Sequence, residues 1–257
     1  MRKWGVLRRV ALVIGFMLLI GLLFYAVFSV AGVRQKMKIL NGQSDAQLLN
    51  FDPLSVDSTY MELFREKNWL ETRLILSKTD SIYLSVDFSD SLVQLEMKGV
   101  VLVQIEMLDF KYDRFFNEIN PGVYLHLFAT QVQVDSTFST IEKAPVTVKK
   151  AAHVSQETKS EVPDTLKRME AVHWVSWLDN GVRINIEGVG TDFSAGSWRS
   201  KVFWISQDLQ KIGKTIRQIS AFKKPDYYPE ITLVLTDRDA KTIFRALPEK
   251  PFVGFRF

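Results

Sequence analysis

Residues 10–33 form an unbroken run of 24 uncharged, mostly apolar residues, and no other feature constrains the chain as much. Basic residues flank this run, four before it and three after it. A helix needs about 20 apolar residues to cross the hydrocarbon core of a bilayer. The sequence therefore predicts a transmembrane helix at 10–33, a short cytoplasmic tail at 1–9 and contact with the lipid bilayer.

A cleaved signal peptide is the alternative interpretation, because Ser29, Val30 and Ala31 have the small-x-small pattern of a processing site. The apolar cores of signal peptides are about 7 to 15 residues long, which is shorter than this run. An uncleaved signal anchor is therefore favoured. The basic flanks place the N-terminus in the cytoplasm. The prediction is a single-pass protein of the inner membrane of the cell envelope, with an extracytoplasmic (periplasmic) C-terminal domain.

Cysteine content and charge exclude several classes of function. The chain has no cysteine, so it has no disulfide, no thiolate metal site, no cysteine nucleophile and no lipoprotein acylation site. The net charge is +4, but seven of the 33 Lys and Arg residues lie in the first 40 positions, which contain no Asp or Glu. The remaining residues carry a small acidic excess. The basic balance therefore does not indicate nucleic-acid binding.

The segment after the apolar run divides into a predicted stalk at 34–57 and a β-rich domain at 58–257. Helical spacing of apolar residues, opened by a capping box of Thr59 and Glu62, predicts an amphipathic helix that ends near residue 78. Alternation of apolar and polar residues then predicts an antiparallel meander of three strands between residues 82 and 107. The same criterion predicts a strand at 123–128, continued by Val132 and Val134.

The second half of the domain begins after a polar segment at 149–165, which predicts a mobile loop. This loop separates either two halves of one domain, which is preferred for this length, or two small domains. Asn180-Gly181 predicts a tight hairpin. Apolar residues in alternating steps of three and four predict a helix at 202–219 that packs one stripe. A strand at 231–235, a helix capped by Thr236 and a strand at 252–257 follow. The predicted fold class is a single N-terminal transmembrane helix plus a mixed, β-rich α+β domain.

Candidate chemistry is sparse. The three histidines are scattered along the chain, and no ligand spacing indicates a metal or a cofactor. Gly188 and Gly190 lack the third glycine of a dinucleotide-binding loop, and helix capping accounts for Asp237 and Asp239. Four tryptophans can line a ligand groove, although core packing is the favoured interpretation. These are Trp174, Trp177, Trp198 and Trp204.

Three segments together resemble the L,D-transpeptidase catalytic domain, a β-rich fold that crosslinks cell-wall peptides through a cysteine thioester. The segments are residues 81–95, Ile186-Glu187-Gly188 and residues 235–247. The resemblance implies that Glu187 stands where the family has its histidine and Thr232 where it has its cysteine. A threonine beside a carboxylate does not replace a low-pKa thiolate beside a base. The resemblance therefore implies a pseudoenzyme, with the fold retained for binding or assembly.

The sequence leaves three functions open. The leading interpretation is a non-catalytic envelope protein that binds cell-wall material, such as peptidoglycan, or an envelope protein partner. Its candidate ligand-binding residues are Glu187, Thr232 and His173. The first alternative is an unrecognised cell-wall hydrolase or transferase that uses Glu187 with Thr232 or His173. The second alternative is a structural bitopic subunit of a membrane assembly.

Overall fold

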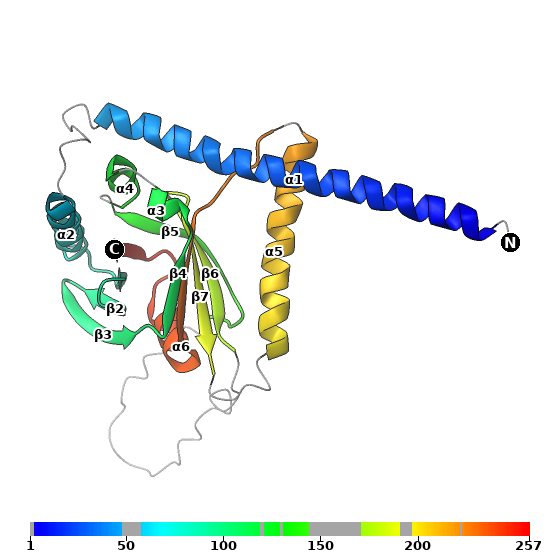
Figure 1. Ribbon diagram of the computed structural model, residues 1–257. Coiled ribbons are helices and arrows are strands. Elements are labelled where there is room, and N and C mark those ends of the chain that lie inside the picture. Colours follow the sequence, from blue (N-terminus) through cyan, green and yellow to red (C-terminus); the bar gives the residue numbers. More distant parts are fainter. Residues whose placement is uncertain are drawn as a thin grey trace, which may run out of the picture.

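The computed structural model describes residues 3–47, 58–118, 121–128, 131–143, 171–190, 197–221 and 223–257. Helices and strands alternate irregularly along the chain (Figure 1). The elements are α1 (Lys3–Gln47), α2 (Ser58–Leu76), β1 (Tyr83–Asp87), β2 (Leu92–Met97), β3 (Val100–Glu106), β4 (Asp109–Tyr112), α3 (Phe115–Glu118), α4 (Pro121–Phe128), β5 (Val132–Ser139), β6 (His173–Leu178), β7 (Arg183–Val189), α5 (Ser197–Ser220), β8 (Glu230–Thr236), α6 (Asp237–Ala246) and β9 (Phe252–Arg256).

The described strands form one mixed nine-stranded sheet in the order β3-β2-β1-β9-β5-β6-β7-β8-β4. The pairs β1–β9 and β7–β8 are parallel, and the other pairs are antiparallel. The edge strands β3 and β4 follow one another in sequence. The amide of Met107 donates to Ser91 beside β2, and that of Leu108 donates to Val234 in β8. The sheet must therefore curl until its two edges meet at residues 107–108.

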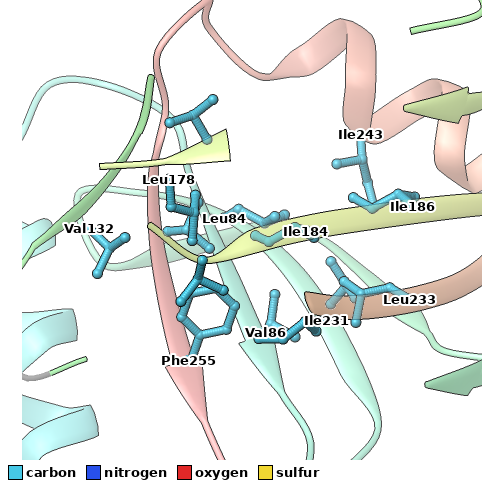
Figure 2. Close-up of a cluster of buried hydrophobic side chains, with 14 of the residues drawn as sticks. Leu84, Val86, Val132, Leu178, Ile184, Ile186, Ile231, Leu233, Ile243 and Phe255 are labelled. Atoms are coloured by element: carbon cyan, nitrogen blue, oxygen red, sulfur yellow. The ribbon is translucent and has the colours of Figure 1, made fainter. Parts of the chain in front are cut away.

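The curled sheet encloses the hydrophobic core. Buried aliphatic side chains from β1, β5, β6, β7, β8 and β9 meet there, and Ile243 of α6 packs near Ile186 (Figure 2). At one end the rings of Phe88, Phe110 and Phe257 bring β1, β4 and the C-terminus together, with Phe88 lying 5.1 Å from Phe110 and 4.8 Å from Phe257 between ring centroids. Burial of such side chains contributes about 1.5–3 kcal/mol each, so this core is the main stabilising element of the fold.

Helices cover different parts of the sheet. Trp69 and Leu76 of α2 pack over Gly254 in β9, where a side chain on the glycine would meet the Trp69 ring at 3.3 Å. Phe244 of α6 packs on Trp174 of β6, with ring centroids 5.3 Å apart. Helix α5 lies on the other side of β6 and β7, and α1 crosses one end of α5 (Figure 1). The sheet face beneath α5 is therefore distinct from the face that carries the core.

The predicted membrane-spanning helix is wrong. In the part of the chain that the structure describes, no helix is long and apolar enough to cross a membrane. The prediction counted all of residues 10–33 as lipid-facing, but the run's last residues contact the protein itself. Tyr25 lines a pocket with α5, and Gly32 lies against the backbone of Pro225. The transmembrane fold class, the signal anchor, the inner-membrane localisation and the periplasmic placement are corrected accordingly.

Three further predictions differ from the structure. Residues 121–128 form helix α4 rather than a strand. A short apolar run buried on both sides does not distinguish a strand from a helix, and Pro121 at the first position favours a helix start. Helix α1 continues to Gln47, through part of the predicted stalk. The apolar stripe of α5, expected to pack, is exposed.

Local turn and cap signals predicted the hairpin and helix α6 correctly. Gly181 has φ +81°, which the hairpin between β6 and β7 requires, and Asn180 precedes it. The hydroxyl of Thr236 accepts from the amide of Asp239 at 3.1 Å and caps α6. The predicted loop at 149–165 lies outside the described residues.

Replacing the N-cap, Thr236→Ala, should lower the free energy of unfolding by about 1 kcal/mol, because the capped amide loses its acceptor. Urea unfolding followed by circular dichroism measures this loss. The matched control is Thr242→Ala on the exposed side of the same helix, which should change stability by less than about 0.5 kcal/mol. Equal effects of the two substitutions would contradict the capping role.

Candidate functional site

The side of the sheet that faces α5 is unusually polar. On this side, alternate positions of β7 carry Arg183, Asn185 and Glu187, and those of β8 carry Glu230 and Thr232, whereas the residues between them are aliphatic. We call this surface the polar face. It consists of His173 and Trp177 on β6, Arg183, Asn185 and Glu187 on β7, and Glu230 and Thr232 on β8.

A buried charge lies at the end of the polar face where β7 and β8 begin. The Arg183 side chain is 1% exposed, and its Nη1 lies 3.4 Å from Oε1 of Glu230. Asn185 donates from Nδ2 to the other oxygen of Glu230 at 3.1 Å. Lys211 of α5 donates to Glu230 from above. Glu230 therefore holds two strands and the helix together. Burial lowers the pKa of Arg183, and the charge of Glu230 opposes this shift.

A pair of aromatic rings lies next to the buried charge, on the side of the sheet that faces α5. The ring of Trp177 meets that of Tyr228 edge-on, with centroids 4.8 Å apart. Two cations lie over the Trp177 ring, the Arg183 guanidinium at 5.3 Å and the Lys214 ammonium at 5.4 Å from its centroid. A cation over an indole is attracted by the ring quadrupole. The tryptophan therefore links the buried charge to the surface.

A pocket of about 360 Å³ opens beside this pair. Its volume falls in the range of about 300–1,000 Å³ that is typical of small-molecule sites. Its walls come from α5, β5, β6, the segment 225–230 and α1. The lining residues are Tyr25, Phe138, Trp177, Gln207, Gln210, Lys211, Lys214, Thr215, Arg217, Gln218, Pro225, Asp226, Tyr227, Tyr228 and Glu230.

Hydrogen bonds fix the segment that forms one wall of the pocket. Gln218 of α5 donates to the carboxylate of Asp226 at 2.7 Å and accepts from its amide at 3.0 Å. On the other side, Asp113 accepts from the Tyr227 hydroxyl at 2.8 Å and from the amide of Glu230 at 2.9 Å. The wall is thus tied both to the helix and to the chain that leaves β4, so the pocket is preformed.

All three residues proposed from the sequence lie on the polar face. His173 is directly opposite Glu187 in the β6–β7 pairing. Thr232 is opposite Asn185, whose Nδ2 lies 3.3 Å from its hydroxyl oxygen, whereas Glu187 is opposite Val234. His173 and Glu187 are therefore neighbours, and Thr232 lies two positions along the sheet from Glu187. None of the three lines the pocket.

Burial shifts the pKa values of His173 and Glu187. His173 is 4% exposed and packs against Phe203 and Trp204 of α5. Burial lowers its pKa, and the charge of Asp237 opposes this shift. Neither ring nitrogen has a hydrogen-bond partner among the described residues. Burial raises the pKa of Glu187, and Lys111 opposes that shift.

This arrangement does not activate a nucleophile. The neighbour of the Thr232 hydroxyl is an amide donor, whereas a general base must accept the hydroxyl proton within about 2.6–3.2 Å. In the described part of the chain, no three His, Asp or Glu side chains converge in a way that could hold a metal ion. The geometry therefore supports binding better than it supports turnover.

Sequence reasoning missed the residues that form the pocket. The sequence allows Trp177 as a groove residue but favours the core, whereas the structure places it at the pocket wall. Trp174 does lie in the core, and Trp198 is exposed. No motif in the sequence singles out Arg183, Lys211, Lys214 or Glu230. The polar residues at alternate positions of 183–187 and 230–232 were a usable signal, because they indicate a polar sheet face.

Comparison with protein-family models, with curated proteins and with solved structures finds no match for this chain. The resemblance to L,D-transpeptidases therefore stays a prediction.

Removing the carboxylate of Glu230 should strongly destabilise the fold, because Arg183 would remain as a buried charge without its partner. We expect Glu230→Ala to lower the free energy of unfolding by about 3 kcal/mol or more. Glu71→Ala removes an exposed carboxylate that pairs with Lys67 on α2, and it should cost less than about 1 kcal/mol. Chemical unfolding of both variants makes the comparison, and similar losses would contradict the central role of Glu230.

The lowered pKa of His173 gives a signed prediction for stability against pH. Below about pH 6.5 the unfolded chain takes up a proton at this position before the folded chain does. The stability due to neutral His173 is thus present above that pH and decreases as the pH falls toward the lowered, folded-state pKa. His173→Phe keeps a ring against Phe203 and Trp204. Between about pH 7 and 5, its free energy of unfolding should fall less steeply with decreasing pH than that of the wild type. Urea unfolding at several pH values measures both, and equal pH dependence of the two proteins would contradict this prediction.

Proposed function

We propose that this chain is a non-catalytic binding protein whose pocket beside α5 takes an anionic saccharide ligand, of the class to which cell-wall glycopeptides belong. The observation that carries the proposal is the combination, in one preformed pocket, of an aromatic pair with cations that have no carboxylate partner among the described residues.

The aromatic pair suits the apolar side of a sugar ring. Trp177 and Tyr228 lie at the pocket wall, and Tyr228 is partly exposed. A pyranose ring presents C–H groups on its faces and hydroxyls at its rim, so it packs against an aromatic surface while its rim stays available for hydrogen bonds. A purely ionic ligand, such as free phosphate, would leave this apolar wall unused.

Two cations supply the selectivity for negative charge. Lys211 is neutralised by Glu230, but no carboxylate of the described residues pairs with Lys214 or Arg217 at the pocket. A ligand carboxylate would form charge-assisted hydrogen bonds with these groups. Both lie on α5 within one turn of each other, so one carboxylate can reach both.

Amide side chains complete the set of polar groups. Gln207 and Gln210 line the pocket from α5, and each carries both a donor and an acceptor. Sugar hydroxyls and N-acetyl groups also donate and accept, so amides match them better than charged groups do. A glycopeptide with sugar hydroxyls and peptide carboxylates uses all three kinds of pocket residue at once.

The proposal predicts a preference between two soluble ligands. A disaccharide-tetrapeptide, which carries carboxylates, should bind the full-length chain, and the neutral disaccharide of N-acetylglucosamine should bind at least about tenfold more weakly. Isothermal titration calorimetry measures both affinities. Neither ligand should be cleaved or crosslinked, which mass spectrometry of the recovered ligand checks.

Variants assign the binding to the pocket. Lys214→Ala should weaken the anionic ligand about tenfold, because a hydrogen bond to a charged group contributes about 1.5 kcal/mol. Lys201→Ala removes an exposed lysine of the same helix outside the pocket lining and should leave the affinity unchanged. Absence of binding at millimolar ligand, or an equal loss in both variants, would overturn the proposal.

A further inference from the structure

The outward side of α5 carries an apolar stripe that no described part of the chain covers. Its residues follow one another in strictly alternating steps of four and three, beginning at Trp198 and ending at Ile216. Their side chains are between 39% and 76% exposed. The members are Trp198, Val202, Ile205, Leu209, Ile212 and Ile216. We call them the α5 stripe.

The spacing of the α5 stripe indicates the kind of surface that fits it. Apolar residues that repeat every 3.5 positions keep one seam of a helix facing a second helix over several turns, as in a coiled coil. A helix that merely covers its own sheet usually points its apolar side inward. Here the inward side carries Phe203 and Trp204 against His173 near its start, but its later turns are polar, with Gln207 buried and Lys211 bound to Glu230. The stripe therefore fits a helical partner outside this chain.

Gly213 supports a closely approaching helix. Glycine inside a helix is unfavourable relative to alanine, yet a side chain added at Gly213 would meet nothing within 4 Å in the folded chain. No contact within the described chain requires the glycine. Gly213 lies on the same side as the α5 stripe, one turn from Leu209 and from Ile216, where a missing side chain lets a neighbouring helix approach.

The area of the α5 stripe is compatible with self-association. At these exposed fractions the six side chains leave on the order of 600 Å² of apolar surface, at the upper end of what a monomer normally exposes. Complete burial of both stripes would remove about 1,200 Å², which is the lower limit for a specific interface. The positions that flank the seam carry three charged residues, Arg199, Lys201 and Asp208. Each copy therefore brings a net charge of +1 to the flanks of the seam, and the area rather than the charge supports self-association.

We propose that a second copy of this chain docks on the α5 stripe, so that two α5 helices pack against each other with close approach at Gly213. The pocket lies on the opposite side of α5 and stays accessible in such a dimer. The dimer thus presents two pockets, and it does not depend on the nature of the ligand.

The test is the mass of the full-length chain in solution, measured by light scattering and sedimentation over a range of concentrations. The wild type should show a monomer–dimer equilibrium. Leu209→Lys should raise the dissociation constant at least about 30-fold, because it places a charge at the centre of the seam. Leu74→Lys on α2 is the matched control, since Leu74 and Leu209 are both 62% exposed, and it should leave the equilibrium unchanged.

Gly213→Ala distinguishes a dimer that forms through the α5 stripe from a monomer in which the stripe faces solvent. Alanine is the better helix former, so without a dimer contact it would raise the melting temperature and leave the mass unchanged. In the proposed dimer the added methyl group meets the partner helix and should weaken association about tenfold. A monomer at all concentrations, a dimer indifferent to Leu209→Lys and Gly213→Ala, or equal effects of Leu209→Lys and Leu74→Lys would overturn the proposal.

Discussion

The guanidinium of Arg183, almost entirely removed from water, is the feature on which the rest of the site depends. A charge in that position must be paired, because an isolated buried ion is very costly. Its partner, Glu230, comes from the neighbouring parallel strand, and it also binds Lys211 of α5. The need to pair this charge therefore brings polar groups of the helix down onto the sheet.

The inward orientation of the polar side of α5 has two consequences. Between helix and sheet, imperfect filling by long polar side chains leaves a pocket with an aromatic wall at Trp177 and Tyr228. On the outside, the apolar residues of the helix have no sheet to cover and remain exposed. The proposed binding function and the proposed dimer thus use opposite sides of a single helix.

Local signals in the sequence predicted local structure well. Asn180-Gly181 determines a turn through its own backbone preferences, and Thr236 caps α6 through an amide three residues away. These local signals do not determine how the elements pack in the tertiary structure. Spacing identified the helix at 202–219 but not which side would face the sheet. Hydropathy treated residues 10–33 as one uniform run, although Tyr25 and Gly32 contact α5 and Pro225 in the fold.

The candidate site was predictable only in part, for the same reason. His173, Glu187 and Thr232 do share the polar face, because strands β6, β7 and β8 are neighbours in the sheet. The pocket, however, is formed by residues from β5, β6, α5, α1 and a loop, and no motif in the sequence connects them. Lys214 and Trp177 are 37 positions apart and meet only because α5 packs over β6 in the fold.

The most direct test of this account is a double-mutant cycle between helix and sheet, using Lys211→Met, Glu230→Gln and the combined variant, with chemical unfolding as the measurement. If α5 docks by its polar side, the two substitutions should be coupled by about 1 kcal/mol or more, since the pair is only partly exposed. A helix that instead packed its apolar stripe on the sheet would leave Lys211 in solvent. A coupling near zero would therefore contradict the account.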